Sequence, residues 1–356
     1  MSAAEALILK SIRLSANLQK PNGSFPAGHN GPYFDPETSA RSTSHWVIAN
    51  LYAWKRTGET QFKDVARAGI GYLVNIVRQA GDHGVVARET AGKDKTNGLI
   101  GQAWIIEALA EAGWFLKHED ALLVAESLFR RHEFDSSANA WFTAPASTSE
   151  RPEFDRTFNH QLWFAAAGAL LVRCGIDVQE PIEHFVNHHV EHVKQYPSGL
   201  IHHSNPYFIA SDAKQKLKSF ARHARVLVNR QKVYMKSIGY HTFNTYAFAM
   251  IEGSLPHLHL GEMESVRKAV DFVESKDFQS KIGGSSYSYA YNPPGFEAAY
   301  TLKVFKGVTD PFETPLMKPQ IELTYDEMSG HFTKNVADVN TSAARVYEAA
   351  RLLEAE

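Results

Sequence analysis

The stretch His83-Gly-Val-Val-Ala87, with Asn97-Gly-Leu-Ile-Gly-Gln102 one loop further along, shows the unit from which the chain is built. A short extended segment leads through a polar loop into an apolar helix that opens on polar side chains, and this unit recurs six times. The other extended segments are Asn22-Gly-Ser-Phe-Pro26, Asn139-Ala-Trp-Phe-Thr143, Ser198-Gly-Leu-Ile-His202, Gly284-Ser-Ser-Tyr-Ser288 and Ser329-Gly-His-Phe-Thr333. The other helices open at Ser42-Thr-Ser-His-Trp46, Phe158-Asn-His-Gln161, Tyr240-His-Thr-Phe-Asn244, Gly295-Phe-Glu297 and Val339-Asn-Thr341. Such units bury their apolar faces only against one another, so the repeat predicts stacked helical hairpins.

Apolar residues between these segments recur at helical spacing. Residues 3–19 form an amphipathic helix, whereas Thr43–Lys55 is apolar on most sides, as a buried inner helix would be. Further outer helices are predicted near 60–79, 117–132, 180–195 and 261–275, and inner helices near 97–112, 158–173, 241–253, 296–306 and 340–354. An additional helix is predicted over 211–230, and 307–328 is expected to be irregular. We therefore predict one all-α domain over residues 1–356 that is built from six helical hairpins. If these hairpins close into a ring, the polar helix starts, the short β segments and the loops lie at one mouth.

Composition and charge narrow the class of protein. The 44% of hydrophobic residues allow a large core, and a formal net charge of −2 with mixed signs argues against nucleic-acid binding. Residues 1–10 lack the basic and apolar regions of a secretory signal. No apolar run approaches the ~18 residues of a membrane span. We expect a cytoplasmic protein without membrane insertion, and we leave oligomer formation open.

Cofactor chemistry is not expected from the sequence. The chain has no glycine-rich phosphate loop, nucleophile elbow or zinc signature. The single cysteine, Cys174, lies in an apolar helix and is predicted to be a buried, inert thiol. His184, His188, His189 and His192 have helical spacing, but they lie on an expected outer helix and are predicted to form a solvated face.

The densest group of polar residues is Glu153-Phe-Asp-Arg-Thr-Phe-Asn-His-Gln161. Asp155 and Arg156 precede an inner helix, and Asn159 and His160 begin it, before an apolar wall that includes Trp163. Asp, Thr and Asn also cap helices for structural reasons alone. Capping does not easily account for Asp, Arg, Asn and His together, so we predict a functional site here.

A second group lies at the start of the fourth inner helix, where Tyr240, His241 and Asn244 converge. A histidine at a helix start is more often structural, but two His–Asn pairs on two inner helices weaken that alternative.

A third group is the tyrosine-rich segment that leads into the fifth inner helix. Tyr289 and Tyr291 either stack on a sugar or pack under the loop, and Glu297 in the first helical turn is explained equally well by the helix dipole.

The remaining units place further candidates at the same position in the repeat. They are Arg41 and His45 in the first unit, Arg88, Lys95, Asn97 and Gln102 in the second, and Asn340 in the last. Trp46, Trp104 and Trp163 recur near three successive inner-helix starts, where tryptophans either fill the ring centre or floor a sugar-binding cleft.

With this repeat, the chain resembles the (α/α)6-barrel carbohydrate-active enzymes. These include six-hairpin glycosidases such as unsaturated glucuronyl hydrolases, N-acylglucosamine 2-epimerases and toroidal polysaccharide lyases. Asn159-His160 followed by Trp163 is similar to the Asn-His-x-x-Trp signature of alginate-type lyases. The resemblance implies an all-α (α/α)6 toroid with short β segments and loops at one mouth. It also implies an enzyme that processes a uronic-acid-containing oligo- or polysaccharide, although fold alone does not fix function.

The favoured function is a glycoside hydrolase, with Asp155 as general acid/base and Glu297 as the second carboxylate. In that case the substrate carboxylate is held by Arg41, Lys95 and Arg156, and the hydroxyls by Asn159, His160, His241 and Asn244. A lyase would use His160 or His241 as base, Tyr240 as acid and Asn159 to brace the carboxylate. An epimerase would use His160 and His241 as opposed acid and base, and a non-catalytic glycan-binding toroid is the last alternative.

Two geometric expectations follow. Arg41, His45, Asn97, Asp155, Asn159, His160, His241, Asn244 and Glu297 are predicted to line one cleft at one end of the ring. The long loop 19–40, which carries Phe25, His29, Asn30, Tyr33 and Phe34, is predicted to fold over the rim of that cleft.

Overall fold

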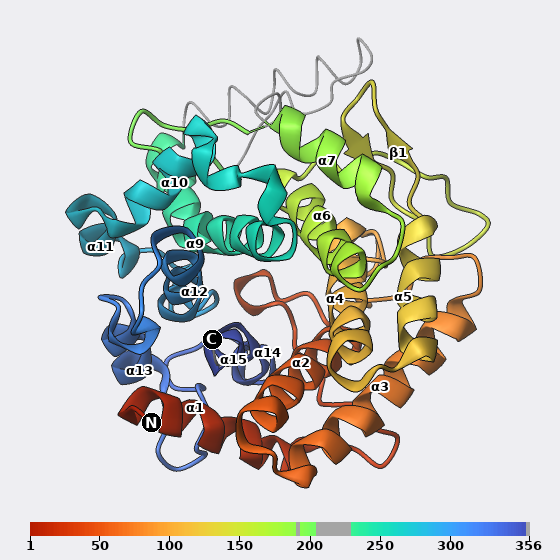
Figure 1. The fold of residues 1–356 in the computed structure, drawn as a ribbon, viewed down its shortest axis with the longest axis horizontal. Coiled ribbons are helices and arrows are strands. Elements are labelled where there is room, and N and C mark those ends of the chain that lie inside the picture. Colours follow the sequence, from red (N-terminus) through yellow and green to blue (C-terminus); the bar gives the residue numbers. More distant parts are fainter. Residues whose placement is uncertain (190–192, 204–228, 354–356) are drawn as a thin grey trace.

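The computed structural model describes residues 1–189, 193–203 and 229–353, and they form a closed ring of helical hairpins (Figure 1). The inner helices are α2 (Ala40–Thr57), α4 (Gly98–Leu116), α6 (Phe158–Arg173), α9 (Arg230–Ser254), α12 (Pro294–Lys306), and the short pair α14 (Val339–Ala344) and α15 (Tyr347–Ala350). The outer helices are α1 (Ala3–Leu14), α3 (Thr60–Ala80), α5 (Glu119–Arg130), α7 (Gln179–His188), α10 (Glu264–Glu274) with α11 (Lys276–Ile282), and α13 (Met317–Thr324). Each inner helix contacts the next, and α15 returns to α2. The predicted all-α (α/α)6 toroid is confirmed.

Inner and outer helices differ because of their sequence patterns. In α2 every residue from Ala40 to Ala53 is buried, whereas α3 and α10 bury only one face, as amphipathic helices do. By length and hydropathy α4 would be able to cross a membrane, so the expectation that no apolar run is long enough was wrong. However, 83% of the apolar window of α4 lies inside the protein, as expected for an inner helix.

Buried ion pairs connect the last inner segment to the rest of the ring. Arg345, which follows α14, bonds Glu297 of α12 at 2.7 Å and also pairs with Glu348. Arg351, in the 3₁₀ turn η7 (Arg351–Leu353), pairs with Glu107 of α4 at 2.6 Å and with Glu111 at 2.5 Å. All these side chains are almost completely buried, so each charge depends on its partner.

Polar side chains in the first turns of the inner helices hold the extended segments in place. Thr43 accepts a hydrogen bond from Phe25 N, and Gln102 bonds both Val85 N and Val85 O. Gln161 bonds Trp141 N and O in the same way, and His241 accepts from Ile201 N. This clamp is one physical reason why the repeat couples an extended segment to a polar helix start.

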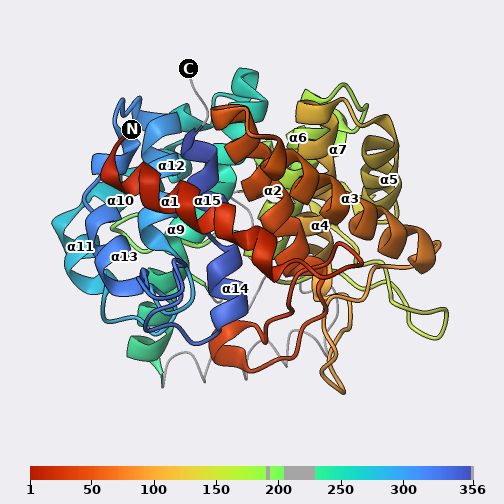
Figure 2. The same ribbon diagram turned by 90° about the horizontal axis from the view of Figure 1, so that it is seen from below.

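Loops and short elements gather at one end of the ring (Figure 2). They include the hairpin of β1 (Phe134–Asp135) and β2 (Ala140–Trp141), and the isolated bridge Glu37–Arg88. The 3₁₀ turn η2 (Gly31–Tyr33) belongs to the loop at this mouth. Of the other 3₁₀ turns, η1 (Ser15–Leu18) follows α1, whereas η4 (Pro256–Leu258), η5 (Leu260–Glu262) and η6 (Pro311–Glu313) follow the ends of α9 and α12, away from the helix starts. The short β segments predicted for this mouth are therefore present.

Several helix boundaries differ from the prediction. The helix α9 begins at Arg230, well before the predicted 241, and the segment predicted as irregular contains α13. The last inner helix is interrupted, because Arg345 turns out of α14 to reach its buried partners. The additional helix predicted over 211–230 lies almost entirely outside the described residues.

Candidate active site

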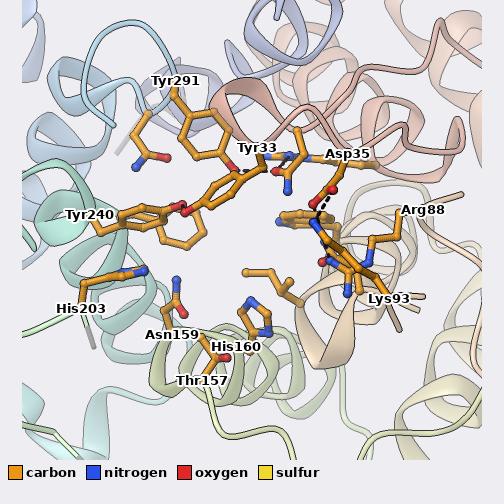
Figure 3. A pocket seen from close by; sticks show the side chains of 17 residues that line it. Tyr33, Asp35, Arg88, Lys93, Thr157, Asn159, His160, His203, Tyr240 and Tyr291 are labelled. Carbon is orange, nitrogen blue, oxygen red and sulfur yellow. Dashed lines mark hydrogen bonds and ion pairs between the residues drawn. The ribbon is translucent and has the colours of Figure 1, made fainter. Parts of the chain in front are cut away.

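A cavity of about 330 Å³ opens at the mouth of the ring, among the starts of the inner helices (Figure 3). The long loop 19–40 forms part of its wall through Asn30, Tyr33 and Asp35, so the expected rim position of this loop is confirmed. Phe25 instead packs in the core, and Phe34 points to solvent against His29. Among the residues that the structure describes, the lining is Asn30, Tyr33, Asp35, Arg41, Arg88, Lys93, Asn97, Ile100, Trp104, Thr157, Asn159, His160, His203, Tyr240, Phe243, Tyr291 and Asn292.

His160 faces this cavity and is oriented by Asp155. The His160 Nδ1 lies 2.8 Å from Asp155 Oδ2. Burial by itself would raise the pKa of Asp155, but His160 and hydrogen bonds from the backbone of Leu99 and Thr157 hold it below its ordinary value. An ionised Asp155 can only accept, so Nδ1 of His160 is the donor and Nε2 is the nitrogen left for proton transfer with a ligand.

The close approach of α4 to this pair requires glycine. Asn97 and Gly98 both have left-handed backbones, with φ of 58° and 61°. A Cβ on Gly98 would lie 2.1 Å from Asp155 Oδ2 and 2.9 Å from His160 Nδ1. The Asn-Gly at the start of α4 therefore makes room for the Asp155–His160 pair.

A second histidine, His203, lines the same cavity. Its ring lies 4.1 Å from the ring of Tyr240. Burial lowers the pKa of His203 well below its ordinary value, and Lys236 and His160 lower it further, so this imidazole is neutral. In Figure 3, His160, Asn159 and His203 follow one another along one side of the cavity.

Three tyrosines form the facing wall. The hydroxyls of Tyr33 and Tyr240 are 2.7 Å apart, and Tyr291 donates to Asn30 at 2.7 Å. Burial raises the pKa of Tyr33 and of Tyr240, so both hydroxyls keep their protons. The cavity thus offers neutral O–H groups opposite two imidazoles.

The third side of the cavity carries cations. Lys93 bonds Asp35 at 2.5 Å, and Arg88 lies 4.0 Å from the same carboxylate. Arg41 is paired with Glu37 at 3.1 Å and lies over the ring of Trp104, 4.2 Å from its centre. Two cations therefore share Asp35, the one carboxylate among the described lining residues, which leaves this side positive.

The structure brings together about half of the predicted site residues. Arg41, Asn97, Asn159, His160, Tyr240 and Tyr291 line the cavity. Lys95, Asp155 and Arg156 line an adjoining groove that shares His160 with it.

His241 and Gln102 do not belong to the site, contrary to the prediction. Nε2 of His241 bonds Ala269 O at 2.9 Å while Nδ1 accepts from Ile201, and burial lowers its pKa to about 4. Gln102 is occupied by Val85 and Thr96 O. Both side chains clamp the extended segments, so neither is available to a substrate.

Glu297 does not belong to the site either, contrary to the prediction. It is completely buried, paired with Arg345 and accepts from Thr242 at 2.6 Å. Burial raises its pKa to about 8 even against Arg345. Glu297 does not line the cavity, and it therefore cannot serve as the second carboxylate of a hydrolase.

The other five candidates lie outside the cavity lining. His45 stacks on Tyr347 with ring centres 4.0 Å apart, Trp163 stacks on Phe243, and Asn244 is 2% exposed. Tyr289 lies in a small separate pocket, and exposed Asn340 donates to Ala27 O. Only some of the predicted cleft residues therefore share one surface.

The sequence analysis missed His203, Asp35 and Lys93 as site residues. All three stand in loops, where helical periodicity carries no information. His203 directly follows the fourth extended segment, and this position in the repeat was the one available signal.

Cys174 and the described histidines of the 184–192 cluster add no catalytic group to the cavity. Cys174 is half-buried, and burial raises its thiol pKa, which disfavours a reactive thiolate. His184 bonds Asn139 and His189 is buried against Ser265, so these two are not part of a solvated face, while His192 lies outside the described residues. Among residues 1–189, 193–203 and 229–353 no group of His, Cys, Asp and Glu could hold a metal ion.

The ring of helical hairpins with a polar cavity at its mouth defines a six-hairpin (α/α)6 toroid, the architecture of many carbohydrate-active enzymes. No protein-family model matches the chain. It is 32% identical to archaeal glycosylation protein Q of Haloferax volcanii over 364 residues, which cover 99% of this chain and 98% of that protein. The chain belongs to the archaeal glycosylation protein Q family.

Solved structures share the fold at low sequence identity. A cellobiose 2-epimerase from Bacillus thermoamylovorans B4167 has a TM-score of 0.65 and 14% identity, over 95% of both chains. A D-mannose isomerase has a TM-score of 0.63 and 16% identity, over 98% of this chain and 97% of that one. The GH76A α-1,6-mannanase of Salegentibacter sp. HEL1_6 has a TM-score of 0.55 and 12% identity, over 99% of both chains.

Proposed function

We propose that this protein is a glycan-processing enzyme, a sugar isomerase or epimerase that acts on the reducing-end sugar of an acidic oligosaccharide. The observation that supports this most directly is the cavity itself. It presents a histidine oriented by an ionised carboxylate, a second neutral histidine and protonated tyrosines around a space suited to a small ligand. A cytoplasmic location stays a prediction.

The proposed chemistry is proton transfer next to a carbonyl group. Nε2 of His160 takes the proton from C2 of a ring-opened sugar, and the C–H electron pair becomes the C1–C2 double bond. The carbonyl electrons move to O1, which receives a proton from His203 or Tyr240. Protonation of C1, with loss of the O2 proton to the group that had protonated O1, gives the ketose. Protonation of the other face of C2, with return of the O1 proton to its donor, gives the epimer.

The other cavity residues would bind the hydroxyl groups and the developing negative charge. Asn97, Asn159 and Asn292 offer amides, and Arg41 lies at the Trp104 wall. Preorganised donors of this kind stabilise an enediolate without reorganising during the reaction.

Hydrolysis, favoured by the sequence analysis, is less well supported by this geometry. A glycosidase needs two carboxyl groups flanking the scissile bond, one of them protonated. Asp155 is held ionised by His160 and two backbone amides, and Asp35 is held by Lys93. The mannanase of similar fold is similar in architecture only, so this likeness does not supply the two carboxyl groups that hydrolysis requires.

A lyase is the second candidate, because Asn159 stands beside His160 and faces the Tyr33–Tyr240 pair (Figure 3). His160 would then take the proton next to a uronate carboxylate, and a tyrosine would protonate the leaving oxygen. This reaction creates an unsaturated sugar, whereas isomerisation does not.

The test is solvent exchange. Glucose, mannose, fructose and glucuronic acid, free and at the reducing end of disaccharides, are incubated with enzyme in D₂O and followed by NMR and ultraviolet absorbance. Deuterium at C2 or C1 is expected, and His160→Gln should slow its uptake by roughly 10²–10⁴-fold. New ultraviolet absorbance would indicate the lyase, and free cleaved sugars without it the hydrolase. Absence of any turnover would support the non-catalytic toroid.

A further inference from the structure

A groove of about 1020 Å³ adjoins the cavity at the mouth of the ring. Its walls are two loops, residues 88–98 and 143–157, on either side of the start of α4. Arg88, Lys93, Asn97, Thr157 and His160 line both spaces. The groove is therefore continuous with the cavity, and His160 stands at the junction.

The described wall of this groove has four acidic side chains, and three of them are hydrogen-bonded within their own loops. Asp94 accepts from Thr96 N, Thr96 Oγ1 and Gly98 N. Asp155 is held by His160, and Glu150 accepts from Ala146 N at 3.2 Å. These hydrogen bonds fix the loop conformations, although the carboxylates that accept them keep their negative charge.

Three basic side chains of the groove differ from these carboxylates, because they have no bonding partner among the described residues. Lys95 and Arg151 are exposed and Arg156 is half-buried, and within the described ranges none of the three forms an ion pair or side-chain hydrogen bond. Glu153 is the one acidic side chain in the described groove wall without such a bond. The described groove wall has five basic and four acidic side chains, so its net charge is small. Lys95, Arg151 and Arg156 are nevertheless available as donors to an anion, because they have no ion pair or side-chain hydrogen bond to another described residue.

We propose that this groove is a second subsite, which binds a negatively charged sugar residue linked to the sugar in the cavity. The inference rests on the proposed function. A chain whose reducing-end sugar reaches His160 must leave the cavity at one side, and the side lined by Arg88 and Lys93 opens into the groove. The group recognised there is an anion on the second sugar, either a carboxylate or a phosphate ester, because Lys95, Arg151 and Arg156 are the unpaired groups that it meets.

Matched ligands test the charge directly. Cellobiose and cellobiouronic acid differ only in a hydroxymethyl or carboxylate group on the second sugar, and cellobiose 6′-phosphate supplies the phosphate alternative. Isothermal titration with the full chain is expected to show roughly tenfold tighter binding of one acidic ligand than of cellobiose. The ligand with the larger advantage identifies the anion, and higher salt should reduce that advantage.

A charge-neutralised variant locates the effect. In Lys95→Ala/Arg151→Ala/Arg156→Ala the ratio of the cellobiose Kd to the acidic-ligand Kd should fall to about one. The control Arg67→Ala/Lys276→Ala/Lys318→Ala removes the same charge from surfaces outside both spaces and should keep the wild-type ratio. Circular dichroism and thermal unfolding confirm that both variants are folded.

Other outcomes overturn the proposal. Equal affinity of the wild type for neutral and acidic ligands, or a ratio that falls equally in the control, excludes a specific anionic subsite. Deuterium exchange with no acidic-ligand advantage would overturn the groove and leave the proposed function standing. No exchange on any reducing sugar would overturn the proposed function, while the ratio would still report on the groove.

Discussion

At His160, local hydrogen bonds determine what the imidazole is able to do. Asp155 caps backbone amides and also holds Nδ1, so one carboxylate carries both the structural and the functional role that the sequence presented as alternatives. Because both roles use the same oxygens, the effect of an Asp155 substitution on turnover must be compared with its effect on folding stability.

For Asp155→Asn we expect turnover to fall by roughly 10²-fold, within the range for a disturbed general base. The amide can no longer act as an anion that fixes the tautomer of His160, but its oxygen still caps the helix, so stability should change by at most about 1 kcal/mol. Steady-state kinetics and urea unfolding measure the two quantities. Asp135→Asn, in the exposed β1 hairpin, is the matched control, and unchanged turnover in Asp155→Asn would exclude the orienting role.

Gly98→Ala should damage the same pair by sterics. The new Cβ would lie 2.1 Å from Asp155 Oδ2 on a backbone with φ of 61°, so the carboxylate or the start of α4 must shift. We expect a loss of stability of about 1–3 kcal/mol together with lower turnover. Gly58→Ala, also at positive φ but with open space around it, isolates the backbone cost from the displacement of Asp155. Equal turnover in the two variants would contradict the steric argument.

Among the elements of the mouth, the loop 19–40 is fixed by contacts with distant units. Asp338, just before α14, accepts from His29 N at 2.5 Å, from Gly31 N at 3.3 Å and from Thr341. Lys236 of α9 lies over the rings of Tyr33 and Tyr287, at 5.1 and 5.0 Å from their centres. The wall of the cavity therefore depends on two elements far away in the sequence.

Asp338→Ala should loosen this loop without touching the Asp155–His160 pair. We expect KM to rise roughly fivefold to tenfold with a smaller change in kcat, because substrate binding must then order the loop. Asp326→Ala removes an exposed carboxylate that also bonds its own turn, and it serves as the control. A fall in kcat alone would show that the loop acts on chemistry and not on binding.

The helix starts also show how far sequence analysis can reach. The repeat correctly places polar residues at the mouth, but neighbouring residues on a helix point about 100° apart. Tyr240 therefore faces the cavity while His241 clamps an extended segment, and His160 faces it while Gln161 clamps another. A difference of one residue in helical phase lies within the uncertainty of boundaries drawn from sequence. Loop residues such as His203 and Lys93 are placed by tertiary contacts that periodicity does not encode.

Across the whole molecule, the six-unit repeat predicted stacked helical hairpins, because such units bury their apolar faces against one another. The resemblance to (α/α)6-barrel enzymes added that the hairpins close into a toroid. The buried charges at its centre were not predictable from the repeat. Glu107 and Glu111 occur within an apolar helix, and their partner Arg351 is supplied by the other end of the chain.

Arg351→Met should be strongly destabilising. The change leaves the carboxylate of Glu107 buried without its arginine, and removal of one partner from a buried pair costs about 3–5 kcal/mol. Arg13→Met breaks an exposed pair with Glu59 and should cost less than about 1 kcal/mol. Chemical denaturation of both variants measures the difference, and equal losses would show that burial of the Arg351 pair is unimportant.

Stability should also depend on pH through Glu297. Its pKa is raised from 4.5 in the unfolded chain to about 8, so the folded protein binds the proton more tightly. The free energy of unfolding should therefore decrease as pH rises from about 4.5 to about 8. Glu297→Gln keeps the neutral form, and we expect a flatter decrease over this range. An unchanged slope in thermal unfolding would mean that Glu297 does not titrate there.

The arrangement of Arg351 also has a consequence for the folding pathway. Its partners Tyr52, Glu111 and Glu107 lie 299, 240 and 244 residues earlier in the chain. An intermediate with only the earlier hairpins formed would leave Glu107 without its counter-ion, whereas Glu111 would have only Arg173 of α6, so this intermediate would gain little by collapsing around Glu107. Because contacts between such distant residues require closure of a very long chain loop, ring closure should be a late, rate-limiting event. The newly synthesised chain would depend on protection from aggregation until that event occurs.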